Sequence, residues 1–448
     1  MKRYWSLYLF FGLFSCQEAP APKVELSAEH FPPREKYEET AFQDTAIAAS
    51  VLYDKVLGFL VGSAIGDAMG APTEMWWRES IADEYNYVDS LDMVLREPSP
   101  EGPWGFNQPP GVGTDDTRWK ALAIQYLEAS EEVRPVQQAP TLAARHFADY
   151  IAFQYEREID TLKATAGVEP EPFEAAMRQL TWLQEWATVA RAYQQGNIDV
   201  YRNSLNRFYG GDMACAGLLY APVIGAFYPG RQEEAYRQMF ELSIFDLGYA
   251  RDVSSLTAAL TAAAFSPGFG EDHLLKVYRE VDPEHYFQSR LLGRIAYRQL
   301  QQARSLVREV ERMGLADFED EQYRMPKDYP YDSLYYARTR HLYEELAAVE
   351  QDVPFHVGEI HLIHLTAMLY CHFDFKKSME FITNLGRDND TVAAVTGAVL
   401  GAYHGFSKLP EEQCRLVLQA NRKHAHIDLE KLAQTLTQLI LERRNTLE

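Results

Sequence analysis

The chain has 448 residues, of which 47% are hydrophobic and 24% charged, so it is long enough to bury one large core or two ordinary ones. Its formal net charge of −22, with no local basic patch in the sequence, argues against nucleic acid as a partner. The four cysteines are widely spaced without a CxxC pair, which indicates neither a disulfide framework nor a cysteine zinc site.

The N-terminus has the pattern of a targeting segment. A short positive region precedes an almost wholly apolar stretch over residues 4–14, and a small serine stands before Cys16. This resembles a bacterial lipoprotein signal and predicts a signal peptide over 1–15, lipidation of Cys16 and a flexible tether over 16–45. The protein would then be extracytoplasmic, periplasmic or on the cell surface, and held to a bacterial membrane by its lipid alone. The alternatives are an ordinary secretory signal with an incidental cysteine, or a single membrane anchor.

Residues 46–448 are predicted to form one all-α domain, a compact multi-helix bundle. Its first helix is indicated by apolar residues at helical spacing over 54–65, where Gly58, Gly62 and Gly66 lie four residues apart. Such glycines leave a groove into which the backbone of another helix can pack closely. A membrane-spanning interpretation fails at this stage because the apolar run is too short.

A loop is expected after this helix, over residues 66–74. It would present two carboxylates, Asp67 and Glu74, with Asp67 orienting the loop. The alternative for each is an ordinary solvated loop carboxylate, which is the commoner fate of an acidic residue.

Two adjacent carboxylates open the next predicted helix, which ends near Glu132. The stretch contains Thr114, Asp115, Asp116 and Thr117. Aspartate at a helix start is first a capping residue, because its oxygens accept unpaired backbone N–H groups. One Asp and one Thr would meet that need, and a second Asp adds repulsion that a divalent cation relieves. Taken alone, the stretch leaves both the cap and the metal site open.

The middle of the chain alternates apolar and polar residues at helical period, and no run of strict two-residue alternation stands out. Helices are predicted over 141–157, 173–195, 232–243, 252–264, 288–313, 333–350, 358–371 and 376–384. His361 and His364, near Glu359, have helical spacing that suits zinc, but without a third ligand motif they are interpreted as interface residues between helices.

The Thr–Asp pattern recurs near the other end of the chain. Asp388, Asp390 and Thr391 stand immediately before a predicted helix of small residues over 392–405. Two helix starts of this kind can converge into one oxygen-rich pocket. Oxygen donors of this kind select Mg²⁺ or Mn²⁺ over zinc.

Three separated segments carry a resemblance to a known family. Residues 66–74 (GDAMGAPTE), 114–117 (TDDT) and 386–391 (GRDNDT) resemble, in order and separation, the signature segments of the ADP-ribosylglycohydrolase family, which includes dinitrogenase reductase-activating glycohydrolases. The small-residue helix after the last segment is similar to the family's closing helix. The resemblance spans roughly residues 50–410.

The resemblance implies an enzyme that uses two Mg²⁺ ions, or Mn²⁺, to activate a water that cleaves an N- or O-glycosidic bond to ADP-ribose. Its substrate would be an ADP-ribosylated protein or a small ADP-ribosyl molecule. Glu74 takes the family's position for a mobile carboxylate suited to proton transfer, and Asp115 and Asp116 would stabilise the positive charge that develops on the sugar. The implied metal ligands are Thr114, Asp115, Asp116, Asp388, Asp390 and Thr391.

The sequence departs from the family at several positions. Leu219 and Phe245 stand where many members carry a Met-Arg and a Thr-His pair, and Arg387 and Asn389 replace small or hydroxyl residues. These changes leave the implied metal ligands in place but put the substrate in doubt. The alternatives are a hydrolase of a related nucleoside-like ribosyl compound and a non-catalytic ADP-ribose-binding protein. The leaving group is not indicated by the sequence.

Overall fold

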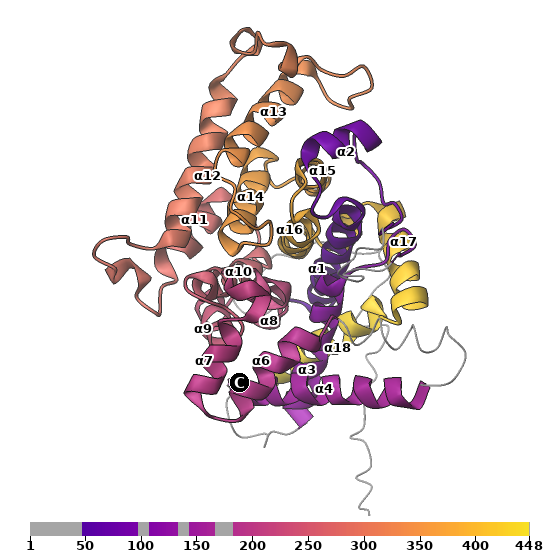
Figure 1. The fold of residues 1–448 in the computed structure, drawn as a ribbon, viewed down its shortest axis with the longest axis vertical. Coiled ribbons are helices and arrows are strands. Elements are labelled where there is room, and N and C mark those ends of the chain that lie inside the picture. The colour runs from indigo at the N-terminus through magenta and orange to yellow at the C-terminus, as the bar shows by residue number, and fades with distance from the viewer. Residues whose placement is uncertain (1–46, 97–106, 133–142, 166–181, 448) are drawn as a thin grey trace, which may run out of the picture.

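A computed structural model of the chain describes residues 47–96, 107–132, 143–165 and 182–447 (Figure 1). These residues form α-helices joined by loops and short 3₁₀ turns, with no β-strand among them, which confirms the all-α prediction. The predicted signal peptide (1–15), the tether (16–45) and Cys16 lie outside the described residues.

The helices are described here in chain order. The first group comprises α1 (Ala49–Gly70), α2 (Arg78–Tyr85), α3 (Asp115–Glu132), α4 (Ala144–Thr165), α6 (Gln184–Gln194), α7 (Ile198–Leu205), α8 (Ala221–Phe227), α9 (Gln232–Leu242) and α10 (Ala250–Ala264). The second comprises α11 (Glu271–Glu280), α12 (Ile295–Arg312), α13 (Ser333–Ala347), α14 (Val357–Tyr370), α15 (Phe375–Leu385), α16 (Asn389–His404), α17 (Glu411–Ala420) and α18 (Leu429–Leu447).

Helices α1 and α16 lie side by side in the middle of the fold, although they come from opposite ends of the chain (Figure 1). A Cβ atom on Gly58 would lie 2.5 Å from the carbonyl oxygen of Gly401, and one on Gly62 would lie 2.5 Å from that of Gly397. The predicted close approach at the glycines is therefore confirmed, with α16 as the partner. This packing brings the C-terminal end of α1 against the N-terminal end of α16, where Gly70 contacts the backbone of Asp390.

The first helix is longer than predicted and does not break at Gly66. It continues to Gly70, and a 3₁₀ turn containing Pro72 follows it. Close packing on α16 offsets the low helix propensity of glycine, whereas proline lacks the N–H that a continuing helix needs. As a result, Asp67 is a buried helix residue, and its predicted place in a loop was wrong. The span 49–73 is long and apolar enough to cross a membrane, but 78% of its apolar window is buried inside the protein, as in a core helix.

Most other predicted helices are present with boundaries shifted by a few residues. The largest shift is at the end of α4, which reaches Thr165 rather than residue 157, and the next is at α12, which begins at Ile295 rather than at residue 288. His285 and Gly293, with φ angles of 58° and 63°, adopt left-handed backbone that interrupts a helix there. Of the helix predicted over 173–195, the structure describes only the part that contains α6.

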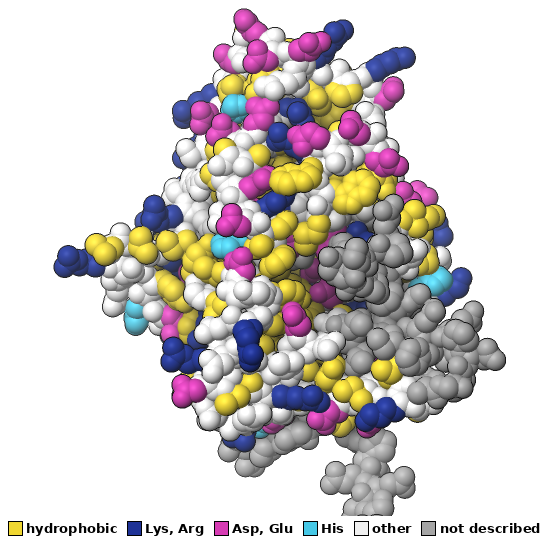
Figure 2. All heavy atoms as spheres, viewed as in Figure 1, with side chains coloured by type: hydrophobic (Ala, Val, Ile, Leu, Met, Phe, Trp, Pro, Cys, Tyr) yellow, Lys and Arg dark blue, Asp and Glu magenta, His cyan; other side chains and the backbone are white. Residues whose placement is uncertain are grey.

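Figure 2 shows Lys and Arg side chains spread among Asp and Glu side chains on the visible face, without a single basic patch. This distribution agrees with the net charge of −22.

Candidate metal centre and active site

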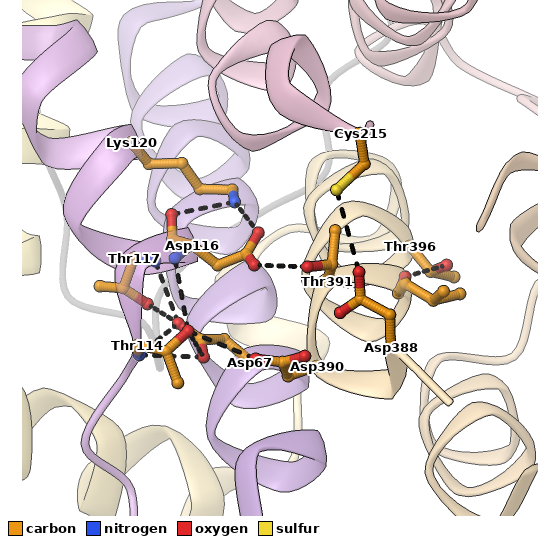
Figure 3. Close-up of polar contacts among 11 residues, drawn as sticks. Asp67, Thr114, Asp116, Thr117, Lys120, Cys215, Asp388, Asp390, Thr391 and Thr396 are labelled. Carbon is orange, nitrogen blue, oxygen red and sulfur yellow. Dashed lines mark hydrogen bonds and ion pairs between the residues drawn. The ribbon is translucent and has the colours of Figure 1, made fainter. Parts of the chain in front are cut away.

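Asp67 caps helix α3 from a distance of 47 residues in the sequence (Figure 3). Its carboxylate accepts hydrogen bonds from the backbone N–H groups of Thr114 and Thr117, both at 3.0 Å, and from the hydroxyls of the same two residues at 2.9 and 2.5 Å. The sequence had suggested that Asp67 orients the loop that carries Glu74. Instead, it orients the start of α3. Because Asp67 takes this capping role, the adjacent carboxylates of Asp115 and Asp116 are not needed as caps.

Asp116 is buried and pairs with a lysine one helical turn further along α3. The ammonium of Lys120 lies 3.2 Å from Asp116 Oδ1 and 3.1 Å from the Asp116 carbonyl oxygen. The other carboxylate oxygen, Oδ2, accepts a hydrogen bond from the hydroxyl of Thr391 at 3.0 Å. This bond joins the start of α3 directly to the start of α16.

The start of α16 supplies two further buried carboxylates. Asp388 is the N-cap residue of α16 but makes no side-chain capping bond, and its Oδ2 lies 3.8 Å from the thiol of Cys215. Asp390 follows in the first turn, and the hydroxyl of Thr114 lies 3.5 Å from its Oδ2. Asp390 Oδ1 is buried without a hydrogen-bond partner among the described residues.

Glu74 reaches the same region from the loop that follows α1. Its Oε2 lies 2.6 Å from a guanidinium nitrogen of Arg96, which also donates to the carbonyl oxygen of Ala71 at 2.8 Å. The next residue, Met75, has left-handed backbone (φ 66°), and its N–H donates to the carbonyl oxygen of Arg387 at 2.7 Å. The loop that carries Glu74 is thus fastened to the segment that carries Asp388.

The donor set fits a hard divalent cation. Glu74, Asp388 and Asp390 each offer an oxygen, and these three oxygens lie within 4.8 Å of one another. The unpartnered oxygen of Asp390 is a second sign, because buried polar atoms normally have a partner. Carboxylates and hydroxyls are the ligands that Mg²⁺ and Mn²⁺ prefer.

Burial and mutual repulsion raise the pKa values of these carboxyl groups. The pKa of Asp390 rises to about 8, first because of burial and then because of the nearby charges of Asp116 and Asp67. The same two causes, burial and the charge of Asp116, raise the pKa of Asp115 to about 6 and that of Asp67 to about 7. Burial and the charge of Asp390 raise the pKa of Glu74 well above its ordinary value. A bound cation would relieve this repulsion.

A cavity of about 90 Å³ adjoins the carboxylates. Its carboxylate side is formed by Glu74, Asp115, Asp388 and Asp390, and its opposite wall is largely apolar. That wall includes Met75, Trp186, Tyr209, Cys215, Leu219 and Phe355.

The departures from the family pattern have different structural roles. Leu219 lines the cavity, whereas Phe245 lies in the core behind Trp186, at 4.7 Å between ring centroids. Arg387 makes a two-point ion pair with Glu359, at 2.7 and 2.9 Å, and holds a left-handed backbone (φ 66°) in place. Asn389 donates to the hydroxyl of Thr73 at 2.8 Å. Only Leu219 among these four faces the cavity.

The glycine-rich turn at residues 210–213 is flanked by residues of the cavity wall but does not itself line the cavity. Tyr209 and Ala214 stand on either side of it in the wall. The turn therefore connects two wall residues, and its own side chains do not face the cavity.

The two histidines of α14 are packing residues, as interpreted from the sequence. The Nε2 of His361 lies 2.9 Å from the hydroxyl of Tyr278, and the Nδ1 of His364 lies 2.8 Å from the hydroxyl of Thr396. Burial lowers the pKa of both rings, to about 3 for His364. Glu359 is engaged by Arg387, so no third zinc ligand joins the pair among the described residues.

Sequence reasoning missed three residues of this site, namely Lys120, Arg96 and Cys215. Lys120 could have been found, because a lysine four residues after an aspartate on a helix is placed to pair with it. Arg96 and Cys215 are brought to the site by tertiary packing, and no local pattern marks them.

Comparison with known proteins identifies the family. A sequence profile described as ADP-ribosylglycohydrolase matches residues 48–446. One solved structure, described as "ADP-ribosylglycohydrolase-related protein complex", is 18% identical, with 87% of this chain and 98% of that chain covered and a TM-score of 0.45. No curated protein matches the chain. The family match extends over most of the sequence and contains both helix starts of the site, and the chain therefore belongs to the ADP-ribosylglycohydrolase family.

Proposed function

We propose that this protein is a Mg²⁺-dependent hydrolase that cleaves an N- or O-glycosidic bond to ADP-ribose. Membership of a glycohydrolase family supports an enzyme of this general kind. The single observation that carries the proposal is the convergence of two Thr–Asp helix starts on one cavity, with a carboxylate oxygen of Asp390 buried and unpartnered there.

The proposed site holds two Mg²⁺ ions, with Mn²⁺ as a possible substitute. When bound, the ions would fix adjacent ribose hydroxyls and activate a water molecule for attack on the anomeric carbon. The proposed ligands are Thr114, Asp115, Asp116, Asp388, Asp390 and Thr391. Glu74 also fits this set, because its carboxylate oxygen lies within 4.8 Å of those of Asp388 and Asp390.

Glu74 is the proposed proton-transfer group. It is partly buried at the cavity, where burial and the charge of Asp390 raise the pKa of its carboxyl group, as suits a proton donor. Arg96 holds one oxygen of this carboxylate and so positions it. Cleavage of a glycosidic bond develops positive charge on the sugar ring, which Asp115 in the cavity lining would stabilise.

The apolar wall bears on the choice of substrate. The cavity has room for only one end of an ADP-ribosyl compound, so the rest of the substrate would extend beyond it. Leu219 presents an apolar side chain in the segment where many relatives carry a Met-Arg pair, and this favours a nucleoside-like ribosyl compound as the second candidate substrate.

Release of ADP-ribose from a panel of substrates tests the proposal. The panel comprises ADP-ribose linked to arginine, to serine and to an acetyl ester, together with simple nucleosides, each incubated with Mg²⁺ and with a chelator. We expect release from at least one ADP-ribosyl compound, only when metal is present. Release from nucleosides alone would favour the second candidate. Binding of ADP-ribose without turnover of any compound would favour a non-catalytic binding protein.

The cellular location is a separate proposal. The N-terminal pattern supports a lipoprotein anchored at Cys16, on the outer side of a bacterial membrane. Cell fractionation of the wild type and of Cys16→Ala tests it. The wild type should partition with membranes and the variant should not. A wild type found wholly in the soluble fraction would contradict the anchor.

A further inference from the structure

Lys120 is a buried cation at the edge of the proposed metal site. Its side chain is 2% exposed, and its ammonium contacts only Asp116 among the described residues, through Oδ1 and the backbone carbonyl oxygen (Figure 3). A lysine is almost never fully buried unless it is paired, so the position of this ammonium depends on Asp116. Lys120 lies outside the three segments that carry the family resemblance.

The ammonium leaves the two halves of the site unequal. On the α3 side, both carboxylate oxygens of Asp116 are engaged, one by Lys120 and the other by the hydroxyl of Thr391. On the α16 side, Oδ1 of Asp390 has no partner, and oxygens of Glu74, Asp388 and Asp390 already lie within 4.8 Å of one another. Asp388 and Asp390 are therefore open to a cation, whereas Asp116 is already paired with the protein's own ammonium.

A divalent ion bound through Asp116 would meet the ammonium in a buried setting. Like charges repel strongly where water does not screen them, and the ion would also have to displace Lys120 from Oδ1. At the other end, Arg96 holds one oxygen of Glu74 at 2.6 Å, but Asp388 and Asp390 make no ion pair among the described residues and would meet a divalent ion without displacing a cation of their own. The two positions should consequently differ widely in affinity.

We propose that Lys120 is an internal counter-ion of the metal site, which permits one divalent ion to bind tightly and weakens the second position beside Asp116. The inference rests on the proposed function, because it requires the carboxylate cluster to be a metal site. It concerns binding stoichiometry, so it is measured without any substrate.

Titration of the full chain with Mn²⁺, followed by calorimetry and electron paramagnetic resonance, tests the proposal. The wild type should bind one Mn²⁺ with an isolated spin signal, and a second at least about 100-fold more weakly. Lys120→Met keeps the length of the side chain and removes its charge, and should strengthen the second binding step at least about tenfold, with a spin-coupled pair appearing. Lys120→Gln, which keeps a hydrogen-bond donor, should do the same.

Lys55→Met is the matched control. Lys55 is a partly buried lysine of α1 whose ammonium donates to the carbonyl oxygens of Ala402 and Tyr403, at 2.9 and 2.8 Å. It lies twelve residues before Asp67 on the same helix, or about 18 Å at 1.5 Å per residue. Its removal should leave both metal affinities unchanged.

Two results would overturn the inference. One is a wild type that binds two Mn²⁺ ions with affinities within about threefold of each other, which needs no variant to be folded. The other is an unchanged second affinity in both Lys120 variants. A wild type that binds no Mn²⁺ at millimolar concentration would instead overturn the proposed function, and this inference with it.

Discussion

The helix starts of α3 and α16 carry the same Thr–Asp chemistry but differ in how far the rest of the protein satisfies it. At α3, Asp67 supplies the cap and Lys120 neutralises Asp116. At α16, Asp388 makes no capping bond and Asp390 keeps one oxygen unpartnered among the described residues. The first start is balanced within the chain, whereas the second is not.

This difference distinguishes an aspartate that a helix start needs as a cap from an aspartate that is available to bind a ligand. An aspartate that caps a helix is satisfied once its oxygens accept N–H groups, as Asp67 does. A buried carboxylate left without a partner costs stability, and such groups call for a specific explanation, which the proposed cation would provide. The α16 half is accordingly where loss of a side chain should have the largest effect on function.

Asp390→Ala should break the site most completely. It removes the carboxylate with the unpartnered oxygen, and with it a proposed metal ligand. We expect release of ADP-ribose to fall at least about 1,000-fold, since metal catalysis is worth several kcal/mol and each 1.36 kcal/mol is a factor of ten. The rise in melting temperature with Mg²⁺ should also disappear.

Asp83→Ala, at an exposed position on α2, is the control and should match the wild type. Wild-type turnover in the Asp390 variant would show that the cluster is not the active site.

Glu74→Gln should have the next largest effect. The substitution keeps the size of the side chain and its place in the loop but removes the ionisable carboxyl group. We expect kcat to fall about 100-fold with little change in KM, because general acid–base catalysis contributes at least about that factor. Glu79→Gln removes a carboxylate that is 60% exposed a few residues further on, and should leave kcat unchanged. Unchanged turnover in Glu74→Gln would leave this residue as a structural loop carboxylate.

Gly66→Ala should force helix α1 away from helix α16. A Cβ at this position would collide with the carbonyl oxygen of Ala393, and α1 would have to move away from α16. Overpacking of this kind costs about 1–3 kcal/mol, which chemical denaturation would detect. Gly270→Ala is the matched control, because its backbone is extended (φ 176°) and the nearest atom to a new Cβ is 4.0 Å away. Equal stability of the two variants would contradict a tight contact between α1 and α16.

The features of this molecule that could be predicted from the sequence are those that depend on residues close together in the chain. Helical periodicity located most of the helices, and the four-residue spacing of Gly58, Gly62 and Gly66 predicted the close helix contact. The Thr–Asp starts predicted a convergence that the structure shows at the cavity. Their roles as metal ligands and catalytic groups remain predictions.

Errors arose where a long-range contact outweighs a local preference. Glycine at 66 and 70 suggested a helix end, but packing on α16 keeps α1 helical to Gly70 and so places Asp67 inside the helix. The cap of α3 comes from a residue 47 positions away, which no inspection of the α3 sequence reveals. Arg96 reaches Glu74 in the same manner, across 22 residues.

The dependence of stability on pH should sharpen the comparison between the two helix starts. The pKa of Asp390 on α16 is raised to about 8, and that of Asp115 on α3 to about 6. Both values exceed the ordinary aspartate pKa of about 3.9. Between that pH and the folded-state pKa of each group, the folded, metal-free protein therefore holds more protons than the unfolded chain. Stability is then greatest at the acidic end and falls as pH rises through the folded-state pKa values. Between pH 6 and 8 Asp390 contributes a loss on the order of 2 kcal/mol, and Asp67, whose pKa is raised to about 7, adds to it.

Denaturation in the presence of a chelator, at pH 6 and at pH 8, measures this loss. Asp390→Asn, which carries no charge at either pH, should lose less stability over the interval than the wild type. Mg²⁺ competes with protons for the same oxygens, so it should stabilise the wild type more at pH 8 than at pH 6. Metal-free wild type that becomes more stable toward pH 8, or loses no more than Asp390→Asn, would mean that Asp390 is already balanced within the chain. The two helix starts would then be equivalent, and the case for a cation at α16 would lose its electrostatic basis.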